Sequence, residues 1–423
     1  MDTQTTLQPA DDALPGDAAT IAACRRFNAV LLIGLGAILA VVVGLNLLLG
    51  ERAVGTPEAV KAASKWQQAT RGITYPPPIT ANRPFKSLRL ADRLPEINGV
   101  VLGASTSMGL TADAFPPDVR IYNFAQTANP LHATIGEAEY IVHHHADRVK
   151  WIFLALDWSV GMLYLPGEAM KIDLSPTAAV SRGALPQVSF LQKLQDAISW
   201  PRVRNLWSIV RLIWRSPEGI AAFKRALLDT SSADYRCPDG TPARDFDTIN
   251  RGSCAGFRYD GSATFADGHP VDPARLDELV WAGAAAGSRY SRPIVQGEGK
   301  LNPALLAGLA KLSSELTAQG GKLVLFAPPL IPGLERALGE SAHAGSSVAR
   351  TKMALDEWAK RTGLVIIDAG ASERFGCTAP EFLDEHHAYP ACYRKVFARF
   401  WERYASGRPI TPGLWVPGLG STN

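Results

Sequence analysis

Val100-Val101-Leu102-Gly103-Ala104-Ser105-Thr106-Ser107 joins an apolar run directly to a turn of small and hydroxyl-bearing residues. This pattern predicts a buried strand that stops at a sharp bend. Gly103 permits the bend, and Ser105 follows at the edge of the predicted sheet. A helix beginning after Ser105 would direct backbone N–H groups at any anion formed there. An ordinary helix cap is the alternative interpretation, because Ser and Thr often cap a helix after a strand.

Outward from this segment, short β-rich apolar runs alternate with helical patterns. The predicted strands are residues 99–103, 119–124, 151–157, 322–327 and 364–368, and the predicted helices are residues 131–147, 303–319, 347–361 and 390–404. This alternation predicts an α/β fold with a parallel sheet and crossover helices. Ligands of such sheets bind at the carboxyl ends of the strands, so we expect the chemistry at that edge.

A second segment with catalytic potential is Asp384-Glu385-His386-His387, which precedes the last predicted helix. Asp384 and His387 are three residues apart, so a single turn places them on one side, where the carboxylate can orient the imidazole. A surface loop of acidic and basic residues is the alternative. His386 competes with His387 for the role of the base, and the sequence leaves both open.

Residues 27–50 form an apolar segment that contains no charged side chain. As a helix, this segment is long enough to cross a hydrocarbon core of about 30 Å. A cleaved signal peptide is the alternative, but its apolar core would be only about 7–15 residues long and would end at small residues. We therefore expect a single-pass anchor in the inner (cytoplasmic) membrane. Arg25 and Arg26 precede it, which predicts that residues 1–26 stay inside and that the remainder is periplasmic or extracellular.

Composition divides the rest of the chain. The acidic, Ala- and Pro-rich residues at the start predict an irregular cytoplasmic tail within 1–26. The expected order is then the transmembrane helix 27–50, a connector 51–95, an exported domain 96–408 with a mostly helical insertion at about 160–300, and a C-terminal tail 409–423. In the insertion, Trp200, Trp207 and Trp214 recur every seven residues and would share one helix face, packed on the core or lying at the membrane.

The bulk composition excludes some functions. The chain has 423 residues, of which 47% are hydrophobic, so it can bury a sizeable core. Its net charge of +3 is spread without a basic patch, which argues against a nucleic-acid partner. No Gly-rich phosphate loop or CxxC pattern indicates a cofactor or metal, and the adjacent histidines at 143–145 point about 100° apart on a helix. We expect neither a cofactor nor a metal.

Four cysteines follow the apolar segment in two local pairs. Cys237 and Cys254 lie in one Gly- and Asp-rich stretch, and Cys377 and Cys392 bracket another. An even set in an exported domain predicts two disulfides, and of the three pairings that four cysteines allow we favour the two local ones. Buried free thiols are the alternative.

The order of these motifs resembles the SGNH (GDSL-type) hydrolase superfamily. The strand ending in Gly103-Ala104-Ser105 is followed by Tyr122-Asn123-Phe124-Ala125-Gln126-Thr127-Ala128-Asn129, then by Leu154-Ala155-Leu156-Asp157, and finally by Asp384-x-x-His387. The resemblance covers most of residues 97–404 outside the insertion. It is closest to a membrane-anchored branch that includes alginate acetylation proteins and the D-alanine transfer protein of teichoic acids, and it implies a flavodoxin-like three-layer fold.

The resemblance also implies a serine mechanism. Ser105 would attack an acyl carbonyl, His387 would take its proton, and Asp384 would stabilise the imidazolium. The backbone N–H groups of Ser105 and Ala128 would form the oxyanion hole.

Three positions depart from the family pattern. Ala104 stands where an Asp is usual, and Ala128 stands where a Gly is usual. Leu156-Asp157-Trp158 replaces a Gly-x-Asn-Asp block, which removes the side-chain amide of the oxyanion hole unless Asn129 supplies it.

The sequence therefore predicts an exported acyl-ester enzyme, an O-acyltransferase or an esterase, that acts on cell-envelope polysaccharide. One alternative is a non-catalytic accessory subunit of a membrane acyltransferase or glycan assembly complex that keeps the fold. Another is a glycan-binding module, which exposed aromatic residues along a groove would favour.

Overall fold

The computed structural model describes most of the chain outside the insertion. The described residues are 17–52, 64, 65, 67–69, 71, 82–127, 129–157, 162, 163, 191, 198, 214, 256–264, 270–407 and 409–417. Three sequence predictions lie outside them: the disulfide between Cys237 and Cys254, the oxyanion donor at Ala128, and the helix face shared by Trp200 and Trp207. Trp214, the third tryptophan of that pattern, is described and is 88% exposed.

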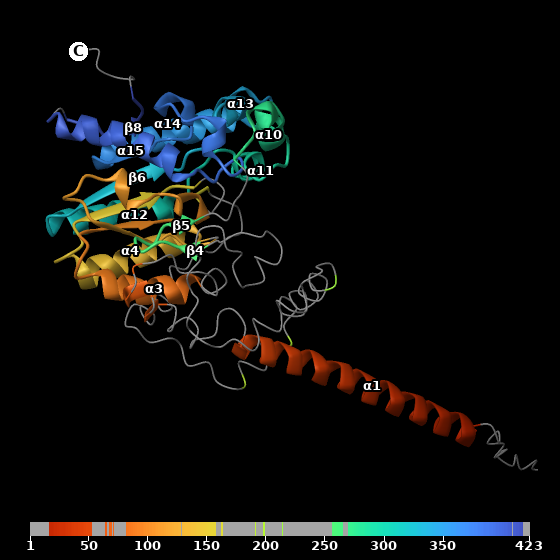
Figure 1. Cartoon of the computed structure of the whole chain (residues 1–423). Coiled ribbons are helices and arrows are strands. Elements are labelled where there is room, and N and C mark those ends of the chain that lie inside the picture. Colours follow the sequence, from red (N-terminus) through yellow and green to blue (C-terminus); the bar gives the residue numbers. More distant parts are fainter. Residues whose placement is uncertain are drawn as a thin grey trace, which may run out of the picture.

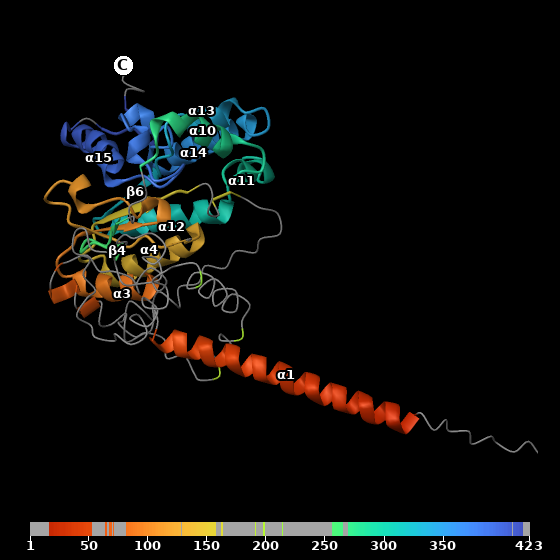
Figure 2. The same cartoon turned by 45° about the vertical axis from the view of Figure 1, so that its right-hand side comes forward.

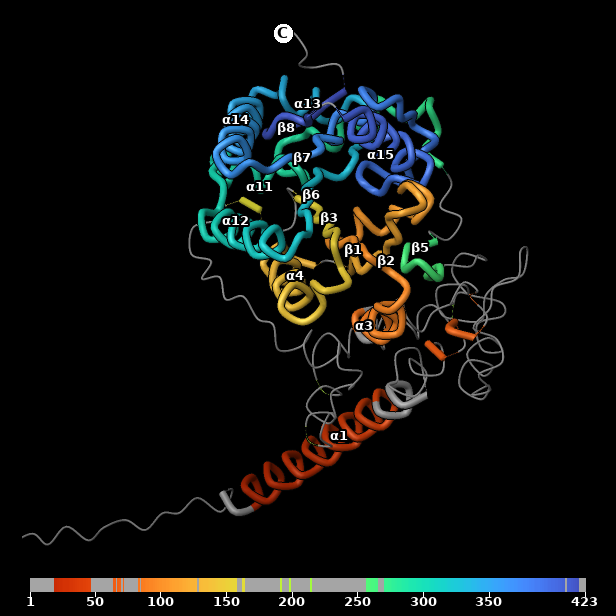
Figure 3. The backbone as a smooth tube through the Cα atoms, turned by 90° about the vertical axis from the view of Figure 1, so that its left-hand side faces the viewer, coloured from red at the N-terminus to blue at the C-terminus, as the bar shows by residue number. Residues whose placement is uncertain are grey.

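A six-stranded parallel sheet forms the centre of the described residues beyond α1 (Figure 3). Its strands are β1 (Gly99–Leu102), β2 (Ile121–Asn123), β3 (Trp151–Ala155), β6 (Lys322–Ala327), β7 (Val365–Asp368) and β8 (Gly413–Trp415), in the spatial order β2-β1-β3-β6-β7-β8. Every neighbouring pair is parallel, and Gly99 of β1 lies opposite both Ile121 and Trp151. The predicted α/β class with a parallel sheet is confirmed, and all five predicted strands are present.

Helices cover both faces of this sheet (Figure 1). The helices are α1 (Asp17–Arg52), α3 (Asn82–Arg93), α4 (Leu131–His145), α10 (Leu276–Ala284), α11 (Ser291–Gln296), α12 (Pro303–Ala318), α13 (Leu334–Glu340), α14 (Gly345–Thr362) and α15 (Pro390–Ala405). Short 3-10 turns occupy η1 (Ser105–Ser107), η2 (Ala112–Ala114), η4 (Pro273–Arg275), η5 (Ser372–Phe375) and η6 (Ala379–Glu381). The four predicted helices correspond to α4, α12, α14 and α15.

Side-chain alternation along the strands separates two hydrophobic clusters. Val100 and Leu102 of β1 point into a cluster that they share with α3, α4, α12 and α14. Val101 points to the opposite face, into a cluster with α13 and α15. Figure 3 shows α4, α12 and α14 along one side of the strands and α15 along the other. Because both faces are buried, the central strands consist of nearly continuous apolar residues, which is why they were recognisable in the sequence.

Three boundaries differ from the sequence predictions. α1 begins at Asp17, inside the predicted irregular tail, because the Ala-rich residues 18–23 favour helix. α3 occupies the end of the predicted connector, where Phe85 and Leu90 are buried against the domain. β8 occupies part of the predicted C-terminal tail and pairs with β7. A three-residue strand carries too little periodicity to be recognised from sequence.

α1 extends away from the sheet and its covering helices (Figure 1 and Figure 2). Its segment Ala19–Asn46 has 28 residues and is long and apolar enough to cross a membrane. At 1.5 Å per residue this segment spans about 42 Å, more than a hydrocarbon core of about 30 Å. Its most apolar stretch contains no residue that is buried in the protein, so this surface is available to lipid.

The described part of the insertion is not only helical. Strands β4 (Gly256–Phe257) and β5 (Ala263–Thr264) form an antiparallel hairpin. The carbonyl of Asp260 in its turn accepts a 2.6 Å hydrogen bond from the backbone N–H of Asn123, so the hairpin lies at the outer edge of β2. A Cβ at Gly261 would approach the Asn123 carbonyl oxygen to 2.3 Å, so this close contact requires glycine.

Candidate active site

Ser105 is the first residue of η1, directly after β1. Gly103 turns the chain there with a φ of 156°. A Cβ at Gly103 would lie 2.4 Å from Ser107 Oγ and 2.7 Å from the Cβ of Ala155. No side chain fits that space, so Gly103 allows the turn to close against β3 and leaves Ser105 partly exposed at the carboxyl edge of the sheet.

The loop that carries the predicted acid and base is held at several points. Leu383 N–H donates to the His387 carbonyl at 2.9 Å, and Ile331 N–H donates to the Glu385 carbonyl at 2.9 Å. Asp384 Oδ1 accepts from the backbone N–H groups of both His386 and His387, at 2.9 and 2.8 Å. The carboxylate is therefore oriented by its own turn, as the three-residue spacing predicts.

The three predicted residues form one continuous chain of hydrogen bonds. His387 Nε2 lies 3.0 Å from Ser105 Oγ, and His387 Nδ1 lies 2.7 Å from Asp384 Oδ2. Ser105 and His387 are 282 positions apart in the sequence. The distances are those of a serine, a base that takes its proton, and a carboxylate that fixes the tautomer of the base.

The electrostatics of Asp384 suit the third role. Burial by itself would raise the pKa of this carboxyl. The hydrogen bond from His387 and the charges of His387 and His386 outweigh burial and hold the pKa of Asp384 well below its usual range. Asp384 is thus ionised at every pH at which the protein would work, and it can stabilise an imidazolium at His387.

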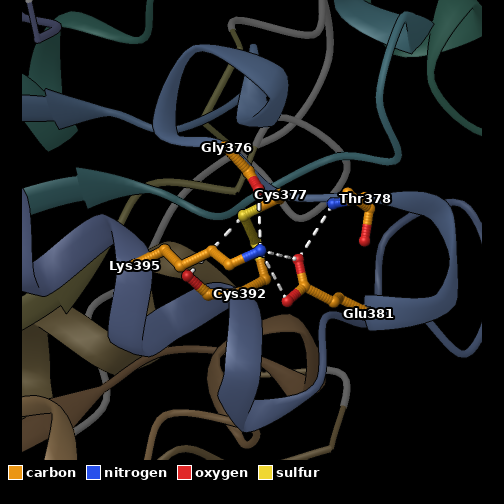
Figure 4. The surroundings of a disulfide bond; sticks show 6 residues. All are labelled: Gly376, Cys377, Thr378, Glu381, Cys392 and Lys395. Carbon is orange, nitrogen blue, oxygen red and sulfur yellow. Dashed lines mark hydrogen bonds and ion pairs between the residues drawn. A yellow bond between two sulfur atoms is a disulfide. The ribbon is translucent and has the colours of Figure 1, made fainter.

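A disulfide anchors the segment that contains this loop. Cys377 and Cys392 are bonded, with their Cα atoms 5.1 Å apart, which confirms one of the two predicted local pairings (Figure 4). Lys395 of α15 donates to the Gly376 carbonyl at 2.7 Å and pairs with Glu381 at 2.8 Å. These contacts tie the start of residues 377–392, the acid-base segment, to α15.

The predicted oxyanion hole is only partly described. In the described part of the chain, the backbone N–H of Ser105 donates to no protein acceptor, so it is available to an oxyanion. The expectation that Asn129 supplies a side-chain donor needs correction. Its amide donates to Thr134 Oγ1 at 3.1 Å and to Glu137 Oε2 at 3.0 Å, so both amide hydrogens are already used.

Asn129 belongs instead to a buried polar network that sequence reasoning missed. Arg83 of α3 donates to Asn129 Oδ1 at 2.7 Å and to Glu137 Oε1 at 2.6 Å. Gln126 Nε2 donates to the same Glu137 oxygen at 3.1 Å. Burial raises the pKa of Glu137 to about 7, although Arg83 and Asn129 act to lower it. A glutamate inside the apolar pattern of a predicted helix was the available signal.

A buried lysine, Lys86, binds the carbonyl groups at the start of the loop that follows β2. Lys86 Nζ donates to the Asn123 carbonyl at 3.1 Å and to the Ala125 carbonyl. It also lies 4.7 Å from the ring centroid of Phe257. Burial lowers the pKa of Lys86 to about 7, while the Asp260 and Glu137 carboxylates act to raise it. The network and this lysine together position the loop that follows β2.

Thr106, next to the predicted nucleophile, is fixed by two hydrogen bonds. Its Oγ1 donates to Asp157 Oδ2 at 2.8 Å, and its carbonyl accepts from the Tyr393 hydroxyl. Asp157 therefore supports the turn that carries Ser105. Thr106 and Asp157 line a small cavity with a volume of about 20 Å³, room for about one water molecule. Little space remains behind the turn for a bulky group.

His386, the competing histidine, has a different environment from His387. It is 5% exposed, and its Nε2 lies 2.8 Å from Arg289 Nη1. The two imidazole centroids are 4.0 Å apart. His387 therefore contacts Ser105, whereas His386 contacts Arg289. No pattern in the sequence had indicated Arg289.

Asp384, His386 and His387 are also a set of donors that lie within 4.8 Å of one another, as a metal site requires. Their donor atoms are already committed, because His387 bridges Asp384 and Ser105 while His386 faces a guanidinium. A cation placed here would meet the positive charge of Arg289. The arrangement fits proton transfer better than metal binding.

Of the sequence-predicted site residues, the structure brings Ser105, Asp384 and His387 together. Asn129 is drawn into a separate network, and Ala128 lies outside the described residues. Comparison of the chain with models of known protein families, with curated proteins and with solved structures found no match.

Proposed function

We propose that this chain is a membrane-anchored acyl-ester enzyme with an SGNH-like fold, either an O-acyltransferase or an esterase, that acts on cell-envelope polysaccharide. The observation that carries the proposal is the chain of hydrogen bonds from Asp384 through His387 to Ser105, at 2.7 and 3.0 Å. Three residues from two distant segments meet in the order that acyl transfer by a serine requires.

The mechanism follows from these contacts. Ser105 Oγ attacks the ester carbonyl carbon while its proton passes to His387 Nε2. The intermediate collapses, the bond to the leaving alcohol breaks, and His387 returns the proton to the leaving oxygen, so the acyl group stays on Ser105. Water or a sugar hydroxyl then gives its proton to His387, attacks the acyl carbon and releases Ser105. Asp384 stabilises the imidazolium in both steps, and general-base assistance of this kind is worth about 10²–10⁴-fold in rate.

The fold supports the superfamily part of the proposal. Without the β4-β5 hairpin, the strand order is second, first, third, fourth, fifth and sixth along the chain. The first five follow the order of flavodoxin-like sheets, which place their ligands at the carboxyl ends of the strands. Ser105 follows β1 at that edge, beside the point between β1 and β3 where the strand order reverses.

Two observations support the proposed location of the protein. Arg25 and Arg26 favour a cytoplasmic start of α1, which puts the domain in the periplasm or outside the cell. The Cys377–Cys392 disulfide agrees, since such bonds persist in oxidising compartments. Envelope polysaccharide is the acceptor that the family resemblance implies.

The second candidate is a non-catalytic accessory subunit of a membrane acyltransferase or glycan assembly complex. One observation favours it: Asn129 cannot replace the missing oxyanion amide while its donors bind Thr134 and Glu137. Such a protein would keep the fold and the triad geometry without turning over an ester.

The test is covalent labelling of the full-length protein in detergent micelles with an activated alkyl phosphonate, followed by peptide mass spectrometry. We expect one adduct at Ser105 in the wild type. Ser105→Ala and His387→Ala should abolish it, whereas His343→Ala, which removes an exposed histidine outside the site, should leave it unchanged. If the folded wild-type protein stays unlabelled, the enzyme hypothesis fails and the accessory-subunit hypothesis takes its place.

A further inference from the structure

Two imidazoles share one carboxylate in this site. Asp384 binds the ring of His387 at 2.7 Å and the backbone N–H groups of both histidines. His386 Nδ1 lies 3.2 Å from the other carboxylate oxygen, an electrostatic contact that is not aligned as a hydrogen bond. If His386 carried a charge, it would compete for Asp384 and would repel the imidazolium that forms at His387 during acyl transfer. The site therefore needs His386 to remain neutral.

Arg289 meets that need by geometry. Its Nη1 lies 2.8 Å from His386 Nε2. A guanidinium has only donors and keeps its charge, so Nε2 must be the acceptor of this bond. His386 then holds its single proton on Nδ1, on the side that faces Asp384. The contact is incompatible with an imidazolium at His386, because that ring would present a second N–H to the Arg289 donors.

We propose that Arg289 is a positioning residue of the acyl-transfer site: by donating to His386 it keeps that ring neutral and oriented beside Asp384, so that only His387 exchanges protons with Ser105. This inference rests on the proposed function. It also assigns a role to the segment between α10 and α11, which lies near the end of the predicted insertion and brings Arg289 to His386.

The net effect of the surroundings of His386 also favours a neutral ring. His387 and Asp384 face it from its own loop, Arg289 and Tyr290 face it from the α10–α11 connection, and Asp157 faces it from the end of β3. Burial lowers the pKa of His386 to about 4, aided by the charges of His387 and Arg289, while Asp384 and Asp157 act to raise it. Near neutral pH the ring is therefore uncharged.

The turn that carries Arg289 is well ordered by hydrogen bonds. Ser288 Oγ donates to the Gly283 carbonyl at 2.5 Å and accepts from the backbone N–H of Ser291 at 3.0 Å. Ser291 Oγ donates to the Ala285 carbonyl at 2.6 Å. Tyr290 is buried and stacks edge-on against His386, with ring centroids 5.5 Å apart. Arg289 thus lies in a hydrogen-bonded turn while its own side chain is exposed, so it can be changed without opening the core.

A direct test is nitrogen-15 NMR of histidine-labelled full-length protein in micelles, with His386→Gln identifying the His386 signals. We expect His386 to be a neutral Nδ1–H tautomer from pH 8 to pH 5. In Arg289→Leu, His386 should take up a proton between about pH 6.5 and pH 4, because the opposing positive charge is gone. Arg292→Leu, which removes an exposed arginine of α11, should behave as the wild type. An Nε2–H tautomer, or the same titration in Arg289→Leu, would refute the proposal.

The functional test is the pH dependence of phosphonate labelling at Ser105. In Arg289→Leu, labelling should fall about tenfold more than in the wild type between pH 8 and pH 5. The ratio of charged to neutral His386 rises about tenfold for each unit by which the pH falls, and a charged His386 opposes proton uptake by His387. Adding His386→Gln should remove this extra fall. A loss of equal size at every pH would mean a purely structural role and would overturn the proposal. If the wild type is not labelled at all, the proposed function fails, and the NMR titration still decides the role of Arg289.

Discussion

Gly103, Ser105 and Ser107 occupy one turn, in which the side chain of Ser107 leaves no room for a side chain at Gly103. Ser107 Oγ donates to the Ala104 carbonyl at 2.9 Å and lies where a side chain on Gly103 would be. Ser105 then projects from the start of η1 toward His387. At the scale of single residues, the position of Ser105 therefore depends on close packing around Gly103.

Gly103→Ala should destabilise the protein by about 1–3 kcal/mol, because the new methyl overlaps Ser107 and Ala155. The same shift should displace Ser105 and reduce phosphonate labelling more than tenfold. Denaturant unfolding and labelling of the same preparation measure both effects. Gly339→Ala in α13, where a Cβ meets no atom within 4 Å, is the matched control and should stay within about 1 kcal/mol of the wild type. Equal behaviour of the two variants would contradict the packing argument.

Glu137 should make stability fall as the pH rises. Burial raises its pKa from 4.5 to about 7, so the folded state holds more protons than the unfolded state between these values. This contribution to stability is complete below about pH 4.5 and is lost as the pH rises through about 7. Glu137→Gln should flatten the fall in Tm across this window, whereas Glu357→Gln, at an exposed position of α14, should preserve it. An unchanged slope in Glu137→Gln would show that Glu137 does not titrate in this range.

At the scale of elements, the site is assembled by four loops at one edge of the sheet. The turn after β1 carries Ser105, and the segment before α15 carries Asp384 and His387. The α10–α11 connection brings Arg289, and the loop after β2 rests on α3 and α4 through Lys86 and the Glu137 network. The disulfide is the covalent anchor of the acid-base segment.

The double variant Cys377→Ser/Cys392→Ser should lose about 3 kcal/mol of stability, the chain-entropy value for a closed loop of about 15 residues. Because Asp384 and His387 lie within that loop, labelling of Ser105 should weaken as well. Thermal unfolding and labelling rates measure the two effects, and reduced wild-type protein should reproduce them. If stability falls while labelling persists unchanged, the hydrogen bonds of the loop are sufficient to hold the triad.

At the scale of the whole molecule, α1 stands apart from the sheet and its covering helices (Figure 1). The segment Ala19–Asn46 presents apolar side chains with no protein partner in its most apolar stretch, while the sheet and its helices form a closed core in the described residues beyond it. Cys24 is exposed beside Arg25 and Arg26 at the start of this helix. Its accessibility reports on which side of the membrane the chain begins.

In intact cells, a membrane-impermeant maleimide should fail to label Cys24, and it should label Cys24 once the membrane is made permeable. The comparison uses a variant in which Cys237 and Cys254 are changed to Ser, so that Cys24 is the only free thiol expected. A cysteine introduced at exposed Met353 is the positive control and should react from outside. Labelling of Cys24 in intact cells would reverse the proposed orientation.

Local patterns in the chain were sufficient for the α/β class, the five central strands, the four main covering helices, the apolar membrane-length helix and the Cys377–Cys392 pair. Periodicity and spacing are properties of neighbouring residues, so they survive without knowledge of the fold. The hydrogen bonds of Asn129 to Thr134 and Glu137 and the burial of α3 against the domain depend on how the chain packs, and β8 is too short to show a periodicity. The choice of His387 over His386, the 3.0 Å contact with Ser105 and the arrival of Arg289 depend on tertiary structure alone. A hydrogen bond is directional and short, and only the packing of the sheet sets the relative positions of atoms 97 or 282 residues apart.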